Sequence, residues 1–114
     1  MVSRAVDVEL PLVVVEDTRK AQQDVASAYK ETLSCKTVAI TGSVGKTTTR
    51  TMIMALLERS YRTCGTVKNY NNDIGLPVTI GKVDPDCQML VLEMGMNHFG
   101  EMRLLTSIGR PDTV

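Results

Sequence analysis

A short loop with two glycines, one lysine and two threonines carries the clearest chemical pattern in the sequence. Gly42-Ser-Val-Gly-Lys-Thr-Thr48 follows the apolar run Thr37-Val-Ala-Ile-Thr41 and precedes a helical pattern. Between a strand and a helix, such a loop surrounds a phosphate with backbone N–H groups, and the helix dipole adds positive charge. Lys46 would reach the β- and γ-phosphates, and the Thr47 hydroxyl would join a Mg²⁺ shell. The predicted site for ATP and Mg²⁺ comprises Gly42, Ser43, Val44, Gly45, Lys46, Thr47 and Thr48.

The loop departs from the usual GxxxxGK[ST] pattern, because Ile40 takes the place of the first glycine. The shortened form still has the strand before it and the helix after it. This setting favours phosphate binding over a plain strand-to-helix turn.

Two further polar clusters follow predicted strands, so they belong at the edge of a parallel sheet where ligands bind. Glu93 ends an almost wholly apolar strand, which makes it a natural second anchor for Mg²⁺. Asn71 and Asn72 lie in an asparagine-rich loop that ordinary turn chemistry also explains. His98 is equally a ligand, a hydrogen-bond donor or a surface residue. These alternatives stay open on spacing alone.

The elements that must position these residues alternate between strands and helices. Strands are predicted at 12–15, 37–41, 62–67 and 88–93, and helices at 17–33, 46–59 and 101–108. Residues 68–77 are expected to form a loop. Alternation of this kind implies right-handed crossovers and an α/β fold with a mainly parallel sheet covered by helices on both faces. The turn at Arg110-Pro-Asp112 is expected to deliver a further strand.

Each of the first two helices is predicted to bury one apolar stripe. In the helix over 17–33 the stripe is Ala21, Val25, Ala28, Tyr29 and Leu33, and the polar face holds Lys20, Gln23, Asp24, Lys30 and Glu31. In the helix over 46–59 the stripe is Met52, Ile53, Leu56 and Leu57.

Composition excludes several classes of protein. The 114 residues carry 13 Lys and Arg against 13 Asp and Glu, so the excess positive charge of a nucleic-acid binder is missing. The longest apolar run, Leu10 to Val15, is far shorter than the roughly 20 residues of a membrane span, and nothing resembles a secretion signal. We therefore expect a cytoplasmic protein without membrane insertion. Cys35, Cys64 and Cys87 show neither disulfide-framework nor zinc spacing.

The order and spacing of four stretches resemble the Mur ligase family. They are Thr41-Gly-Ser-Val-Gly-Lys-Thr-Thr48, Asn69-Tyr-Asn-Asn-Asp-Ile-Gly-Leu-Pro77, Glu93-Met-Gly-Met-Asn-His98 with Gly100-Glu101, and Arg110-Pro-Asp112. The second and third stretches are the specific ones, and they look most like the branch that uses UDP-N-acetylmuramoyl-tripeptide and D-Ala-D-Ala.

The resemblance implies a P-loop ATPase domain and a division of the chain. Residues 1–34 would be the end of an N-terminal substrate domain with its linker helix, and 35–114 the first half of the central ATP-binding domain. It also implies that ATP phosphorylates the tripeptide carboxylate and that the amine of D-Ala-D-Ala attacks the acyl phosphate. Lys46, Glu93 and His98 would be catalytic, Thr47 and Glu93 would hold Mg²⁺, and Asn71 and Asn72 would line the nucleotide and substrate side.

Two other interpretations are compatible with the sequence. One is a sister ligase of the Mur or folylpolyglutamate type, against which the Asn-Asn-Asp and Asn-His stretches count. The other is a nucleotide-binding module without turnover, which is the expected behaviour of these 114 residues by themselves because half of a domain cannot assemble an amine site. The sequence leaves the oligomeric state open.

Overall fold

A three-stranded parallel sheet forms the centre of the molecule in the computed structural model, which describes residues 1–114. The strands are β1 (Lys36–Ile40), β2 (Thr63–Gly65) and β3 (Met89–Glu93), in the order β1-β3-β2. β3 is the middle strand and pairs with both neighbours, with Ile40 opposite Glu93 and Gly65 opposite Val91. The helices are α1 (Thr18–Thr32), α2 (Lys46–Leu57), α3 (Gly75–Gly81) and α4 (Glu101–Gly109).

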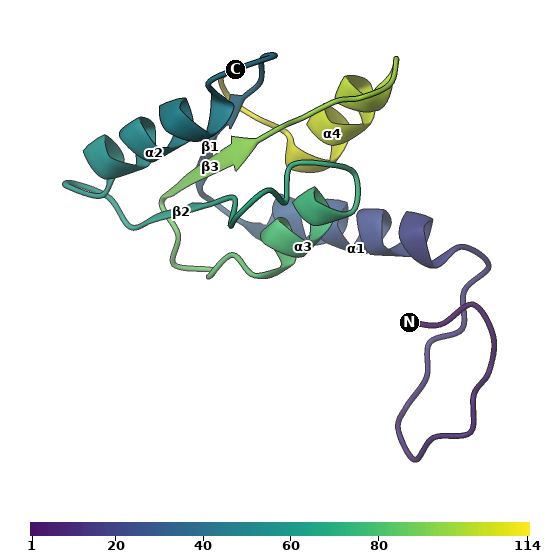
Figure 1. Ribbon diagram of the computed structural model, residues 1–114. Helices are drawn as coiled ribbons and strands as arrows, with labels where there is room; N and C mark the ends of the chain where they lie inside the picture. The colour runs from purple at the N-terminus through teal and green to yellow at the C-terminus, as the bar shows by residue number, and fades with distance from the viewer.

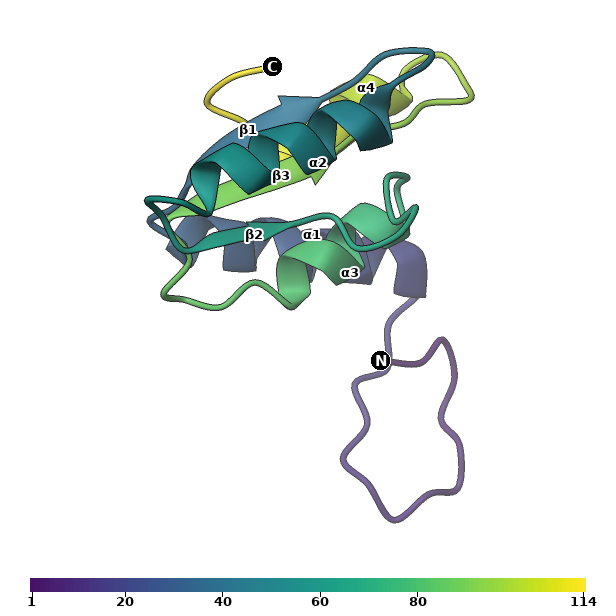
Figure 2. The ribbon, with the colours of Figure 1, turned by 60° about the vertical axis from the view of Figure 1, so that its left-hand side comes forward.

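Helices cover both faces of the sheet, which confirms the α/β class. α2 lies on one face, and α1, α3 and α4 pack together on the other (Figures 1 and 2). The main core fills the second side, where Leu90 and Leu92 of β3 are fully buried with Leu76, Ile80 and Leu105. The apolar run of β3 is therefore explained by burial on both faces, as is typical of a central parallel strand.

Residues after α4 lie beside β1. Thr113 forms a parallel bridge with Val38, and its carbonyl accepts the N–H of Ala39 at 2.8 Å. The Asp112 carboxylate accepts the N–H of Thr37 at 2.7 Å, and this hydrogen bond, followed by one from Lys36, holds the pKa of Asp112 below its usual range. The turn at Pro111 thus begins a further strand alignment, as the sequence predicts.

The strand predicted at 12–15 is wrong. Val14 makes only an isolated bridge with Val2, and Leu12, Val13 and Val14 are exposed. Residues 3–13 instead form a loop that projects away from the sheet (Figures 1 and 2). An apolar β-branched run forms a strand only where a neighbour supplies continuous hydrogen bonds and cover. This run has only two backbone hydrogen bonds, both with Val2, and most of its side chains are uncovered.

The predicted helix faces also need correction. α1 buries Gln23, Ala26 and Lys30, whereas Val25 is 57% exposed, because the side of α1 toward the core is the one that packs against α3 and α4. Tyr29 and Leu33 of the predicted stripe do pack against the core. α2 has no fully buried residue, and Met52 and Leu56 are more than 60% exposed because nothing covers the outer side of this helix.

One helix is missing from the sequence prediction. Residues 74–77 are expected as loop, yet Gly75–Gly81 form α3. Pro77 lies in the first turn, where a missing N–H costs no helical hydrogen bond, so it does not prevent the helix.

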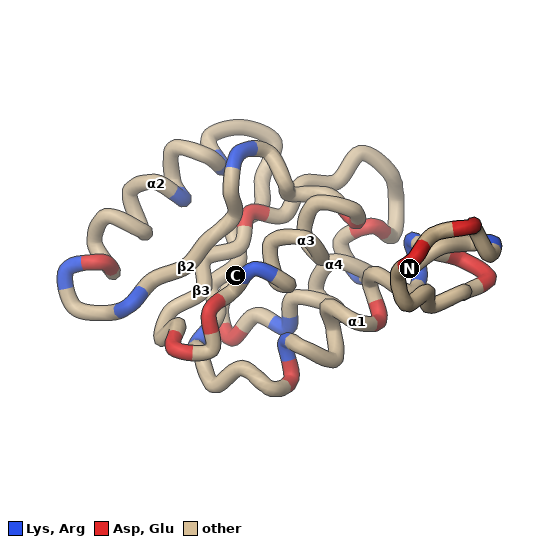
Figure 3. The backbone as a smooth tube through the Cα atoms, turned by 90° about the horizontal axis from the view of Figure 1, so that it is seen from below, with Lys and Arg blue, Asp and Glu red and all other residues tan.

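Charges are dispersed over the molecule. Lys and Arg alternate with Asp and Glu along the backbone and form no single-sign face in this view (Figure 3). No helix combines the length and the apolar character needed to cross a bilayer. The three cysteines are free, and burial, followed by a hydrogen bond with Cys64, raises the pKa of Cys87 to about 12.

Candidate functional site

The loop between β1 and α2 has the backbone of an anion-binding turn. Gly42 and Gly45 have positive φ angles of 142° and 78°, a region that side chains disfavour. Gly45 is the N-cap of α2 and has no side chain to cap the helix, so no side-chain acceptor occupies the N–H groups of the first turn. These groups are therefore open to an external anion, at the positive end of the helix dipole.

Lys46 folds over this loop. Its Nζ donates a hydrogen bond to the carbonyl of Gly42 at 2.6 Å, so the positive charge lies over the turn. Ser43, Val44 and Thr48 are exposed around it. The structure thus gathers the predicted loop residues around one surface position.

Glu93 lies at the adjacent end of β3 and is only 2% exposed. Its Oε2 accepts a hydrogen bond from the Thr47 hydroxyl at 3.1 Å, and its Oε1 accepts one from the Asn71 amide at 2.9 Å. Its backbone N–H donates to the Thr66 hydroxyl at 2.8 Å. The carboxylate is therefore fixed in place by the helix after the loop and by the loop after β2.

Arg50 is a member of this cluster that sequence reasoning missed. Its guanidinium donates to Oε2 of Glu93 at 3.3 Å and to the carbonyl of Lys68 at 2.9 Å, and its side chain is only 12% exposed. Arg50 follows Thr47 by three positions, so both lie on one face of α2. That spacing could have identified it.

The donor set fits Mg²⁺. A threonine hydroxyl and a carboxylate oxygen lie 3.1 Å apart beside the open loop, and both are hard oxygen ligands. Mg²⁺ commonly takes only one or two protein ligands and completes its shell with phosphate oxygens and water.

Two predicted residues lie apart from Glu93. The Asn72 side chain accepts the N–H groups of Ile74 and Gly75, at 3.3 Å and 2.8 Å, and so caps α3. The His98 side chain is 82% exposed and contacts Glu101 at 3.3 Å. No hydrogen bond joins either side chain to the Glu93 cluster.

Glu101 organises the loop that carries His98. Its Oε2 accepts the N–H groups of Asn97 and His98, at 2.6 Å and 3.0 Å. These hydrogen bonds, the one from Asn97 first, hold the pKa of Glu101 below its usual range. His98 also lines a surface pocket with Met96, Asn97, Phe99, Gly100 and Met102.

Comparison with known proteins agrees with this geometry. Curated relatives are named UDP-N-acetylmuramoyl-tripeptide--D-alanyl-D-alanine ligase. The one from Escherichia coli (strain K12) is 39% identical over 98% of the chain, and the one from Bacillus subtilis (strain 168) is 44% identical over 89%. The chain spans only about a quarter of their length, 25% and 22% respectively.

Solved structures show the same fold. A MurF crystal structure from Acinetobacter baumannii superposes with a TM-score of 0.91 at 37% identity, covering 96% of this chain and 24% of that one. MurF ligase from Thermotoga maritima, in complex with ADP, superposes with a TM-score of 0.84 at 30% identity, covering 96% and 25%. Residues 40–114 match the Mur ligase middle domain. The loop, the sheet around it and these matches together show that the chain belongs to the Mur ligase family.

Proposed function

We propose that the chain is part of an ATP-dependent amide ligase that adds D-Ala-D-Ala to UDP-N-acetylmuramoyl-tripeptide during synthesis of peptidoglycan precursors. The observation that carries this proposal is the Thr47–Glu93 contact beside the open glycine loop. The names of the relatives support the ligase reaction, and the ADP complex of the Thermotoga maritima protein supports nucleotide binding. Because the chain spans a quarter of those relatives, we propose nucleotide binding as its own activity.

Each residue has a role that follows from its position. Lys46, whose Nζ lies at the Gly42 carbonyl, would bind the β- and γ-phosphates, and the uncapped first N–H groups of α2 would bind phosphate oxygens. Glu93 and Thr47 would hold Mg²⁺, and the ion would supply positive charge to the phosphoryl group in transfer. Asn71 fixes the rotation of the Glu93 carboxylate by holding Oε1. Following the family resemblance, we propose that Asn72 lines the nucleotide and substrate side and that His98 is catalytic.

The proposed reaction has two steps. The tripeptide carboxylate takes the γ-phosphoryl group of ATP, and the amine of D-Ala-D-Ala then displaces phosphate and forms the amide. We also propose that residues 35–114 are the first half of the ATP-binding domain, and that residues 1–34 end the preceding substrate domain. Localisation in the cytoplasm, where nucleotide substrates are made, belongs to the same proposal.

The first prediction tests nucleotide binding. Lys46→Ala should lower the affinity for ATP with Mg²⁺ at least tenfold, because it removes the charge over the loop. Isothermal titration calorimetry measures the affinity, and circular dichroism checks the fold. Lys82→Ala is the matched control, since Lys82 is exposed at the far end of α3. Equal ATP affinity in the wild type and in Lys46→Ala would remove the phosphate-loop assignment.

The second prediction separates binding from turnover. The 114-residue chain should release no phosphate from ATP when UDP-N-acetylmuramoyl-tripeptide and D-Ala-D-Ala are added. Catalysis needs both substrates held against ATP, an effect that can supply roughly 7–11 kcal/mol of the barrier. A coupled phosphate assay measures release, with the full-length relative from Escherichia coli as positive control. Substrate-dependent release by the chain itself would show that it contains a complete site.

A further inference from the structure

Asp73, in the loop between β2 and α3, is held by two side chains of α1. The Arg19 guanidinium contacts Oδ1 at 2.7 Å and Oδ2 at 2.6 Å. The Gln23 amide donates to the backbone carbonyl of Asp73 at 3.1 Å and to its Oδ2 at 3.3 Å. Gln23 is 7% exposed and the Asp73 side chain 13% exposed, whereas the Arg19 side chain is 57% exposed. The Gln23–Asp73 contact is therefore largely shielded from water, and Arg19 closes it from the surface. α1 therefore grips this loop at one residue.

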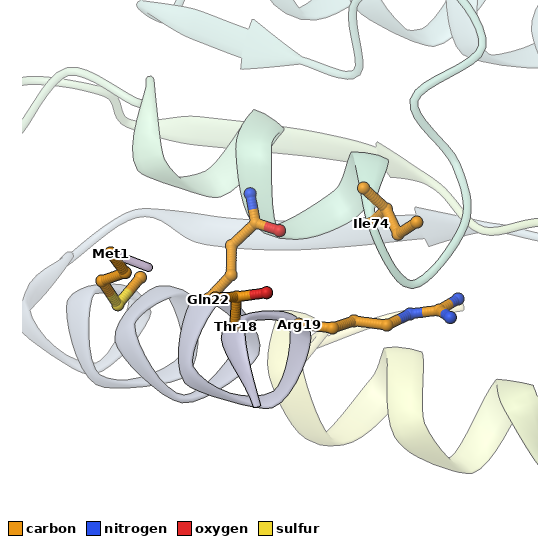
Figure 4. A pocket seen from close by; sticks show the side chains of 5 residues that line it. All are labelled: Met1, Thr18, Arg19, Gln22 and Ile74. Atoms are coloured by element: carbon orange, nitrogen blue, oxygen red, sulfur yellow. The ribbon is translucent and has the colours of Figure 1, made fainter. Parts of the chain in front are cut away.

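Figure 4 shows the direction in which the Arg19 side chain points. Arg19 extends from the first turn of α1 toward the loop that carries Ile74, and the two residues line one surface pocket. The Asp17 side chain caps the same turn by accepting the N–H groups of Arg19 and Lys20. The start of α1 is therefore fixed at the point from which Arg19 reaches out.

The loop that carries Asp73 is a tight turn. A Cβ added to Gly75 would lie only 2.5 Å from the Cα of Tyr70, so the two ends of this turn are in direct backbone contact. The Asn72 side chain caps α3, and the Asn71 carbonyl accepts the N–H of Gly95 at 2.8 Å. A turn held at this many points moves as a unit, so the position of Asp73 fixes that of Asn71.

Asn71 connects this loop to the Glu93 carboxylate. Its amide donates to Oε1 of Glu93 at 2.9 Å, while Oε2 faces Thr47 and Arg50. α1 lies outside residues 40–114, the part that matches the Mur ligase middle domain. A contiguous series of contacts thus links a helix before the matched domain to the carboxylate beside the phosphate loop.

We propose that Arg19 and Gln23 are positioning residues that, through Asp73, hold the Asn71 amide against Glu93. The helix before the matched domain thereby helps to set the orientation of the carboxylate. The importance of that orientation for nucleotide binding rests on the proposed function, whereas the link itself does not. A displacement of α1 would therefore change the orientation of the Glu93 carboxylate.

The test follows the Asn71 side chain by NMR in the 114-residue chain. The Asn71→Ser variant lacks the side-chain amide, so the signals that it loses are those of Asn71. The Glu93→Ala variant gives the chemical shifts of these signals in the absence of the Asn71–Glu93 hydrogen bond. In R19M/Q23M the signals should shift toward the Glu93→Ala position, and their exchange with water should quicken at least tenfold. R19M by itself should give a smaller shift, because Gln23 still donates to Asp73, and R19K should restore most of the wild-type position.

Lys20→Met is the matched control. It breaks the Lys20–Asp24 ion pair on the same helix, which touches no part of the loop, so the Asn71 signals should stay in place. Wild-type Asn71 signals in folded R19M and in R19M/Q23M would overturn the inference. A shift of equal size in Lys20→Met would overturn it too, since any change in α1 would then have the same effect.

ATP titration of the same samples separates the two proposals. In one outcome, the Asn71 signals respond to R19M/Q23M while Lys46→Ala leaves the ATP affinity unchanged. That result would support the link from α1 to Glu93 and contradict the proposed nucleotide binding. If ATP affinity depends on Lys46 while the Asn71 signals do not respond to R19M/Q23M, the nucleotide function stands and the link is overturned.

Discussion

Glu93 shows how one buried carboxylate is made tolerable. An ionised group that is only 2% exposed is costly unless a cation or several donors accompany it. Arg50 supplies the cation, and Thr47 and Asn71 supply neutral donors. The carboxylate is thus satisfied by the chain itself, and Mg²⁺ would join an arrangement that is already in place.

The third prediction concerns this ion pair. Arg50→Met should lower the free energy of unfolding by about 3–5 kcal/mol, because it leaves the Glu93 charge buried without its cation. R50M/E93Q should lose less than Arg50→Met, since the uncompensated charge is gone. Urea denaturation followed by circular dichroism measures both. Strictly additive losses from Arg50→Met and Glu93→Gln would mean that the two residues do not interact.

Among the elements, the 95–100 loop and α4 are joined by Glu101. Gly100 caps α4 with a positive φ of 89° and offers no side chain, so Glu101 reaches back to the N–H groups of Asn97 and His98. The loop conformation therefore depends on an ionised Glu101. The carboxylate also lies in the first turn of the helix, where the dipole favours negative charge.

The fourth prediction follows from the lowered pKa of Glu101. A carboxyl group whose pKa is lower in the folded state stabilises that state fully above its unfolded pKa, about 4.3 for glutamate. The stabilisation is lost as the pH falls from there through the folded pKa. Amide exchange at Asn97 and His98 should therefore be protected at neutral pH and lose protection in acid.

Glu101→Gln should abolish this pH dependence. At neutral pH its 97–98 amides should already exchange faster, because a neutral amide oxygen is a weaker acceptor than a carboxylate. Hydrogen-exchange NMR between pH 3 and 7 measures the effect. Equal protection of these amides in the wild type at both ends of that range would contradict it.

The success of the sequence prediction varied with what each element depends on. β1, α2, β3 and α4 are within two residues of their predicted ends, because local apolar patterns specify the elements and glycines mark the starts of both helices. The run at 12–15 depends on a pairing partner, and α3 depends on an Asn72 cap that turn chemistry hides. Both were therefore wrong.

The same distinction applies to the site. The proximity of Lys46 and Thr47 to Glu93 could be predicted, because each lies at the end of a strand or the start of a helix and sheet topology brings such ends together. Arg50 and Asp73 act through contacts with distant segments, at Lys68 and Glu93 and at Arg19 and Gln23. No local pattern announces such partners. The Gln23 contact also explains why this polar residue is buried on α1.

At the scale of the whole molecule, some apolar segments are packed against other elements and others are exposed to solvent. The radius of gyration is 15.1 Å, whereas about 13 Å is typical of a compact chain of this length, and the 3–13 loop projects from the rest of the molecule (Figure 2). The outer side of α2 is bare, with Met52 62% and Leu56 66% exposed. Exposed apolar surface of this kind favours association with other surfaces.

The fifth prediction uses that bare side. M52K/L56K should change the free energy of unfolding by no more than about 0.5 kcal/mol per residue, because little packing is lost. Concentration-dependent association, followed by analytical ultracentrifugation, should fall. Leu90→Ala is the contrasting variant, since Leu90 is fully buried and its truncation should cost about 2–5 kcal/mol. Unchanged association in M52K/L56K would show that this side of α2 does not mediate self-association.

The order of the strands has a consequence for synthesis on the ribosome. β1 and β2 are synthesised before β3, but they do not pair with each other. Each pairs only with β3, which lies between them in the sheet. Lys36 finds its partner only when Met89 has emerged, so the sheet closes across long stretches of chain in one late event. Until then the glycine loop has no fixed strand before it and α2 has no sheet beneath it. The loop and the carboxylate of Glu93 therefore come together in the same step of folding.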